Sequence, residues 1–290
     1  MSLAINNLYI LGIGAGLLSA LLLGGGDYFA GDIAVKTNTY ISIFMVYIIE
    51  CLVMGTIVLA QGDFGHGGEN FKMFLASISG NLGFIVLIYG LSKGKISVVA
   101  TISGVMQLVV PLIFSLYVDK DVISTLTWVG IAIALISIFF ISFAKHEDEK
   151  SQSLSFSIIT GIVSCLALSV FVTGIVKIET TVSLRLLITA MPAAVAGAVY
   201  FLFKRSDFKN GMKHIVPVVL VAIAYLIGLW ALSYSGHHVS LFISTLLISL
   251  IPAVTVVLAK FHKNELISRI QYFGFALAGS GVITMGLGLS

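Results

Sequence analysis

The stretch TYISIFMVYIIECLVMGTIVLA, residues 39–60, is an apolar run with a single carboxylate, Glu50, near its centre. A helix rises about 1.5 Å per residue and the hydrocarbon core of a bilayer is about 30 Å thick, so roughly 20 such residues span it. A charge at that depth is costly unless it faces a polar cavity, is paired, or takes up a proton. The run contains no Lys or Arg. We therefore predict a bundle of membrane-spanning helices around a cavity that Glu50 faces.

The whole chain has the composition of an integral membrane protein. Of its 290 residues, 58% are hydrophobic and 10% are charged, whereas a soluble domain carries about 25% charged residues. The net charge is +3, and the basic residues are scattered through short connections, so we expect no nucleic-acid partner. We expect a multi-pass protein of the plasma (inner) membrane that contacts the lipid bilayer, is a monomer or homodimer, and has no cofactor.

Polar clusters divide the chain into apolar segments, and each segment is predicted to be one transmembrane helix of an all-α fold. The ten segments are residues 8–30, 39–60, 71–91, 96–117, 124–144, 155–176, 183–203, 215–235, 239–259 and 267–287. The most polar connection, residues 145–153, lies at the midpoint of the chain. We therefore predict two five-helix units, residues 1–146 and 155–290, joined by a linker over residues 147–154.

The two halves resemble each other in sequence. Residues 84–92 (FIVLIYGLS) align with residues 225–233 (YLIGLWALS), and the same register places Pro111 on Pro252. Similar composition among apolar helices is the alternative explanation, but the matched prolines, each expected to bend its helix, favour duplication. Because each half has an odd number of helices, the second copy enters the membrane inverted. Inverted repeats are typical of secondary transporters, whose site lies near the midplane between the copies.

Each half also has a proline in its fourth helix, an acidic residue in the next connection, and a Trp or Tyr two residues before a Gly in the fifth helix. The pattern is clearest in residues 264–281 (NELISRIQYFGFALAGSG). In these features the chain resembles the EamA-type permeases of the drug/metabolite transporter superfamily. It departs from them at residues 24–27 (GGGD), where many members have Trp-Gly, and at residues 118–121 (VDKD), where a Glu-Arg pair is common. The resemblance implies a ten-helix carrier with a central cavity and both termini on one face, and it names no substrate.

The side of the membrane on which the termini lie stays open. With the amino terminus inside, the outer connections would hold about twelve Lys and Arg and the inner ones about four. The positive-inside rule therefore favours termini outside the cell. Many members of the family that the chain resembles have their termini in the cytoplasm.

Glu50 is the first candidate for a binding residue. Tyr47 lies one helical turn before it, so one helix face offers a carboxylate and a phenol. These groups suit an organic cation, or a proton relay in which the carboxyl group binds and releases a proton. The alternative is a neutral Glu that ties two helices together through hydrogen bonds.

Asp27 and Tyr28 follow three successive glycines in residues 24–26. Each glycine weakens a helix by roughly 1 kcal/mol relative to alanine, so the stretch permits an unwound segment whose carbonyls face a ligand, or a hinge for a rocking helix. The alternative is that the glycines end the helix and Asp27 lies at the water boundary.

Further polar and aromatic groups lie within the apolar segments. Asn81 and Gln107 provide neutral hydrogen-bonding groups, and Tyr89, Tyr225 and Trp230 provide rings that stack on a ligand or hold a cation. Each aromatic residue also suits helix packing or an interfacial belt. The adjacent pair His237 and His238 cannot chelate well because neighbouring helical positions point about 100° apart, so we expect no metal site.

Charged residues near the start of the seventh segment have two possible roles. Lys177 and Glu179 lie in a connection, and Arg185 lies just inside the segment. One of them could gate the cavity by a salt bridge, but solvated loop charge is the favoured interpretation.

These observations favour a secondary active or facilitative transporter of a small polar or cationic metabolite, such as an amine or amino acid, that works by alternating access. Coupling to protons is left open. An enzyme is not expected, because the chain lacks a phosphate-binding Gly-rich loop and the Gly-x-Ser-Gly or paired-Asp motifs of intramembrane proteases. A membrane sensor or partner subunit is the other alternative, and it would not need duplicated halves.

Overall fold

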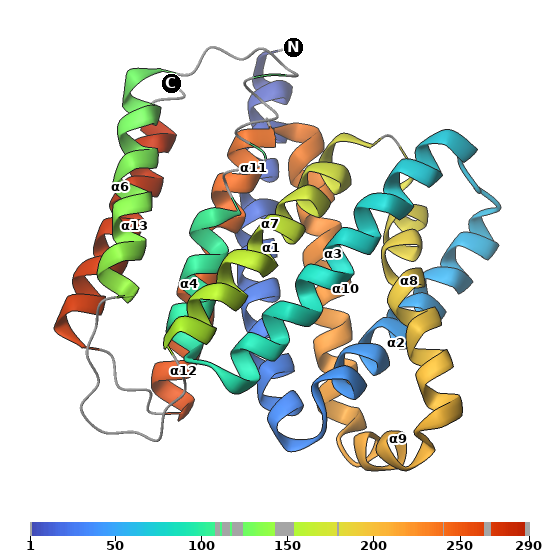
Figure 1. Ribbon diagram of the computed structural model, residues 1–290. Coiled ribbons are helices and arrows are strands. Elements are labelled where there is room, and N and C mark those ends of the chain that lie inside the picture. Colours follow the sequence, from blue (N-terminus) through green and yellow to red (C-terminus); the bar gives the residue numbers. More distant parts are fainter. Residues whose placement is uncertain are drawn as a thin grey trace.

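The computed structural model describes residues 2–107, 111, 117, 124–142, 154–178, 180–239, 241–263 and 268–287, and within these ranges it contains helices and no β-strand (Figure 1). The helices are α1 (Ser2–Lys36), α2 (Thr39–Gln61), α3 (Gly67–Lys93), α4 (Ile96–Met106), α6 (Thr125–Ser142), α7 (Leu154–Lys177), α8 (Val182–Phe203), α9 (Arg205–Met212), α10 (Ile215–His238), α11 (Leu241–Ile248), α12 (Ile251–Lys263) and α13 (Arg269–Leu287). The predicted all-α class is confirmed. Residues 147–153 of the predicted linker lie outside the described residues.

Seven stretches of the described chain are long and apolar enough to cross a membrane. They are Leu8–Lys36, Tyr40–Gln61, Gly67–Lys93, Leu154–Lys177, Val182–Phe203, Ile215–His238 and Ile243–His262. Large apolar side chains on their outer faces, such as Leu82, Ile159 and Val195, are exposed. An apolar outer surface of this kind is expected where lipid, rather than water, surrounds the protein. The chain therefore has the architecture of a multi-pass membrane protein.

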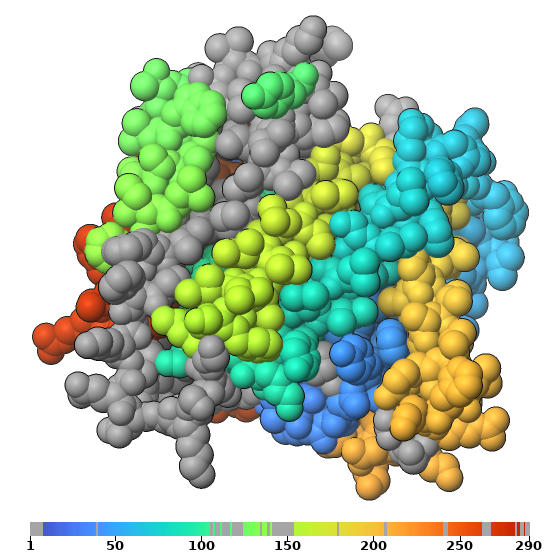
Figure 2. Space-filling view, viewed as in Figure 1, coloured from blue at the N-terminus to red at the C-terminus, as the bar shows by residue number. Residues whose placement is uncertain are grey.

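The helices pack in pairs that join distant parts of the chain. α1 lies against α10, α3 against α7, α2 against α8 and α4 against α12, while α6 and α13 form a pair at one side of the bundle (Figure 1). Figure 2 shows α3 and α7 running side by side across the face in view. Buried apolar side chains between the pairs, among them Ile88, Val99, Ala190 and Ala222, form the main core.

Helix α1 continues without interruption through the glycines at residues 24–26. The expectations of an unwound segment and of a helix end at Asp27 are therefore wrong, whereas a hinge at this stretch stays a prediction. The physical reason is close packing, because a Cβ atom on Gly24 would lie 2.6 Å from the carbonyl oxygen of Ile251 and 2.8 Å from Cβ of Val254. Small residues let membrane helices approach closely, and this contact offsets the low helix propensity of glycine.

The predicted segment 239–259 is divided into α11 and α12 by a turn at residues 249–250. Pro252 follows this turn, and its ring nitrogen has no hydrogen to donate to the preceding helical turn. Gly104 of α4 packs directly against the Pro252 ring, in a space that a Cβ atom would fill. The helix is interrupted directly before Pro252, where the sequence predicted a bend, whereas the residues on both sides of Pro111 lie outside the described chain.

Candidate functional site

A cavity of about 80 Å³ lies where helices of the first half meet helices of the second. One water molecule needs roughly 10–15 Å³ of such volume, so the cavity is large enough for several waters or a small ligand. The described residues that line it are Leu23, Asp27, Val46, Tyr47, Glu50, Gly80, Asn81, Phe84, Leu87, Gln107, Leu168, Phe171, Val172, Thr189, Tyr225, Leu229, Leu232, Ile248 and Ile251.

Glu50 lines this cavity from α2, and 2% of its surface is exposed. Its carboxyl group forms no hydrogen bond or ion pair with any residue of the described chain. The alternative role, in which a neutral Glu ties two helices through hydrogen bonds, is therefore not observed within the described residues. The carboxyl oxygens remain available to a ligand or a proton that enters the cavity.

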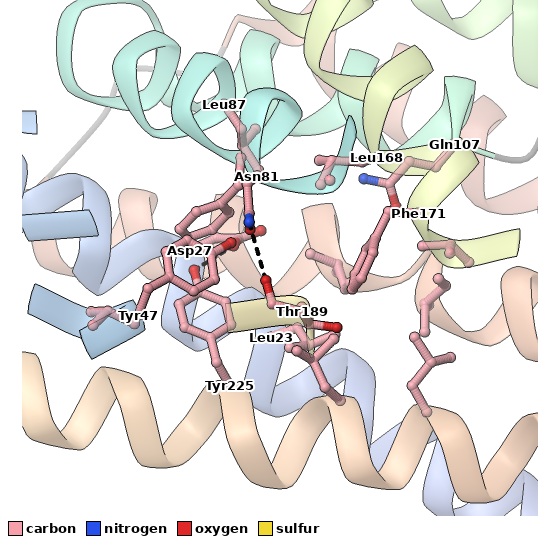
Figure 3. A pocket seen from close by; sticks show the side chains of 18 of the residues that line it. Leu23, Asp27, Tyr47, Asn81, Leu87, Gln107, Leu168, Phe171, Thr189 and Tyr225 are labelled. Atoms are coloured by element: carbon pink, nitrogen blue, oxygen red, sulfur yellow. Dashed lines mark hydrogen bonds between the residues drawn. The ribbon is translucent and has the colours of Figure 1, made fainter. Parts of the chain in front are cut away.

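Asp27 of α1 and Tyr225 of α10 are joined directly. The Tyr225 hydroxyl group donates to Oδ1 of Asp27 at 2.6 Å, and both buried side chains line the cavity (Figure 3). Gly26 makes this approach possible, because a Cβ atom there would lie 3.0 Å from the Tyr225 ring. A hydrogen bond to a carboxylate is roughly twice as strong as one between neutral groups, so it fixes the Asp27 carboxyl group in the cavity.

Three aromatic rings form one wall of the cavity. The edge-to-face contacts of Phe84 place its ring centre 5.7 Å from that of Tyr47 and 5.1 Å from that of Tyr225. Tyr47 lies one helical turn before Glu50 on α2, and both side chains line the cavity. Because the faces of aromatic rings attract cations, the rings and the carboxyl groups favour the same kind of ligand.

Neutral polar groups occupy other parts of the wall. The side-chain amide of Asn81 donates to the backbone oxygen of Thr189 at 3.1 Å and thereby connects α3 to α8 (Figure 3). Gln107 lies beside Phe171 and Leu168, away from the Asp27 end of the cavity (Figure 3). The cavity is therefore acidic and aromatic at one end and mainly apolar at the other.

Not every residue singled out from the sequence reaches the cavity. Those that line it are Asp27, Tyr47, Glu50, Asn81, Gln107 and Tyr225. Tyr28 turns elsewhere, with its hydroxyl group 2.7 Å from Nδ1 of His262. Tyr89 is 40% exposed and packs edge-on against Phe156, and Trp230 is 50% exposed. These three rings lie outside the lining of the central cavity.

Phe84 and Thr189 line the cavity although the sequence did not single them out. A signal for Phe84 was present, because it is aligned with Tyr225 in the repeat register. The backbone oxygen of Thr189 accepts a hydrogen bond from Asn81. Because every residue type has a backbone oxygen, this contact could not be predicted from the sequence.

Arg185, near the start of α8, is fully buried, so the expectation of a solvated loop charge is wrong. Its guanidinium group donates to the backbone oxygens of Ile175 and Thr180 and to the hydroxyl group of Ser233. These bonds join α8 to the end of α7 and to α10. No carboxylate of the described chain forms an ion pair with it. Glu179, the other residue considered for a gate, lies outside the described residues.

The charges of the site favour positive ligands. Its described lining includes the carboxyl groups of Asp27 and Glu50 and no basic side chain. Where the structure describes the chain, no group of three or more His, Cys, Asp or Glu residues could hold a metal ion. The arrangement can pair with an organic cation between aromatic rings, or exchange protons at its carboxyl groups.

Comparison with known proteins supplies a fold and no function. No protein-family model matches the sequence, and no curated protein matches it. Among the solved structures with a similar fold is a chain described only as "Crystal structure of protein", with a TM-score of 0.63 and 12% sequence identity over 97% of both chains. At that identity the likeness concerns the fold alone.

Proposed function

We propose that this chain is a secondary active or facilitative transporter that moves a small cationic or polar metabolite, such as an amine or amino acid, across the membrane by alternating access. The observation that carries the proposal is the central cavity, where Asp27 and Glu50 lie near aromatic rings and no described lining residue is basic. A cation or a proton in this cavity offsets the cost of burying carboxylates in the membrane. A carrier binds such an ion from one side of the membrane and releases it to the other side.

The pairing of helices supports an inverted-repeat architecture of the EamA-type drug/metabolite transporter kind. If the halves correspond in chain order, α1 corresponds to α7 and α3 to α10. The contact of α1 with α10 then corresponds to the contact of α7 with α3, and the pairs α2–α8, α4–α12 and α6–α13 correspond to themselves. This is the pattern expected of ten spans related by a two-fold axis in the membrane plane.

The cavity lining follows the same correspondence. Residues 16–19 (GLLS) align with residues 161–164 (GIVS), and the registers of the repeat extend into the cavity. Equivalent positions that both line it are Leu23 with Leu168, Asp27 with Val172, and Phe84 with Tyr225. Phe84 and Tyr225 also touch each other, as equivalent residues do beside a two-fold axis. The proposed substrate site therefore lies between the repeats.

Close helix crossings provide surfaces on which the two halves could rock. Gly24 of α1 lies against the backbone of Ile251, and Gly104 of α4 lies against the ring of Pro252. At both crossings no side chain of the glycine helix separates the two helices. Contacts of this type allow helices to shift relative to each other without separating interlocked long side chains.

We propose the plasma (inner) membrane as the location. α1 begins and α13 ends at the same end of the bundle, which agrees with termini on one side (Figure 1).

Ligand-induced thermal stabilisation of the purified protein tests this function. We expect ethylamine, putrescine and choline to raise the unfolding temperature of the protein in detergent more than ethanol or acetate does. A ligand at a hundredfold excess over its dissociation constant contributes about 2.7 kcal/mol, which is measurable. Glu50→Gln should remove most of the shift.

The matched control is Glu69→Gln. Glu69 lies in the first turn of α3, where it pairs with Lys72 at 2.7 Å, away from the cavity. Glu69→Gln should respond to amines as the unchanged protein does. Stabilisation by acetate alone, or equal amine shifts with and without Glu50, would contradict a cation site in the cavity.

A further inference from the structure

A second hollow, of about 680 Å³, lies between α2, α8 and α9. Its α2 residues, Met45, Ile48 and Ile49, lie on the helix face opposite Glu50, so this groove is separate from the central cavity. Its volume falls in the range of about 300–1,000 Å³ that is typical of small-molecule sites. All the described residues that line it are apolar: Met45, Ile48, Ile49, Val195, Ala198, Val199, Phe201, Leu202, Phe208, Met212 and Ile215.

Helix α9 closes one end of this groove. It crosses the end of the bundle between α8 and α10 (Figure 1). Its apolar face packs inward, because Phe208 is buried against Phe201 with ring centres 5.0 Å apart, and a Cβ atom on Gly211 would lie 2.7 Å from Sδ of Met45. An amphipathic helix in this position is typical of a segment that lies in the membrane interface.

Four exposed basic residues lie in α9 or directly beside it: Lys204, Arg205, Lys209 and Lys213. α9 also contains Asp207, so the formal net charge of residues 204–213 is +3. Arg205 and Lys209 are one helical turn apart, so they lie on the same side of α9. None of the four forms an ion pair with a residue that the structure describes. The guanidinium group of Arg205 lies 5.8 Å from the ring of Phe201, which itself lines the groove. The positive cluster and the apolar groove are therefore continuous.

We propose that this groove is a binding site for one anionic phospholipid, with an acyl chain in the groove and the headgroup on the basic residues of α9. The groove lies along residues 195–202 of α8, and the cluster begins directly after that helix ends. The apolar groove is thus followed by positive charge, just as the acyl chain of a phospholipid is followed by its charged headgroup. Clusters of Lys and Arg beside a transmembrane helix attract anionic headgroups, and a wholly apolar groove suits an acyl chain.

Native mass spectrometry of the full-length protein in neutral detergent tests this site. Phosphatidylglycerol and phosphatidylcholine with identical acyl chains are the probes, and inorganic phosphate is a competitor. We expect one phosphatidylglycerol to bind in preference to phosphatidylcholine. Arg205→Gln/Lys209→Gln should weaken its binding on the order of tenfold, because each basic residue near a headgroup adds to the attraction.

Two further variants separate the groove from surface charge. Ala198→Phe keeps every charge but places a ring in the groove, and it should also weaken phosphatidylglycerol binding. Lys93→Gln/Arg269→Gln removes two exposed positive charges elsewhere and should bind phosphatidylglycerol normally. The proposal would be overturned by equal binding of the two lipids, by unchanged binding in either the Arg205/Lys209 or the Ala198 variant, or by displacement of the lipid with phosphate alone.

Discussion

At the scale of single residues, Arg185 is the most unusual side chain of the described bundle. A buried guanidinium group is costly unless its N–H groups find acceptors, and here two backbone oxygens and two hydroxyl groups accept from it. The acceptors lie on the last turn of α7 (Ile175), in the connection that follows it (Thr180) and on α10 (Ser233). Carbonyl oxygens at a helix C-terminus carry partial negative charge, which suits a cation. Arg185 therefore ties three helices of the second half together.

We expect Arg185→Lys to destabilise the protein although it keeps the charge. Lysine has a single donor head and cannot reach several acceptors in the fixed geometry of guanidinium. The loss should be roughly 2–5 kcal/mol, since each lost hydrogen bond to a charged group is worth about 1.5–3 kcal/mol. Thermal unfolding in detergent measures it, with the exposed Arg269→Lys as control. Equal unfolding temperatures for the two variants would show that the Arg185 bonds contribute little.

Polar and aromatic residues differ in how well sequence predicts their location. Asn81, Gln107 and Glu50 lie inside apolar runs, and lipid is so unfavourable for them that the protein interior was the natural prediction. Tyr89 and Trp230 are stable both in the interior and on the outer surface, so their residue type does not decide between the two. Arg185 was misjudged because it lies close to a predicted segment end, where a long side chain can usually reach water.

At the scale of helices, the glycines of α1 show the limit of local propensity. Glycine disfavours a helix in water, and the sequence therefore suggested a break or an end at residues 24–27. The helix continues because its neighbours in space require small residues there, and contacts with α12 and Tyr225 are not visible in the local sequence. The interruption before Pro252 was predictable, because the missing N–H group belongs to the residue itself.

Adjacent glycines in α1 provide a matched test of this explanation. We expect Gly24→Ala to destabilise the protein by about 1–3 kcal/mol, because its Cβ atom would meet the Ile251 carbonyl oxygen at 2.6 Å. Gly25→Ala should stabilise it by up to about 1 kcal/mol, because no atom of a neighbouring helix lies within 4 Å of the added Cβ and alanine favours the helix. Thermal unfolding of both variants in detergent checks the opposite signs. The same sign for both would refute packing as the reason for a glycine at position 24.

At the scale of the whole molecule, the two halves contribute different chemistry to one cavity. Asp27, Glu50, Asn81 and Gln107 come from the first half, while the residue that the proposed repeat aligns with Asp27 is Val172. Hydropathy alone predicted the membrane class, and the matched prolines pointed to a repeat. Hydropathy could not predict which helix faces meet, because those contacts depend on packing between segments far apart in the chain. The sequence therefore singled out Asp27 and Glu50, but only the structure shows that they line the same cavity as the rings of Phe84 and Tyr225.

Uptake of a radiolabelled amine into proteoliposomes tests the transport proposal most directly. The probe is the amine that gives the largest thermal shift, and flux is measured with and without a pH difference across the vesicle membrane. We expect saturable flux with the unchanged protein and with Glu69→Gln, and flux with Glu50→Gln that is at least about tenfold lower and no longer responds to pH. Equal flux and apparent affinity with and without the Glu50 carboxyl group would contradict transport through this cavity.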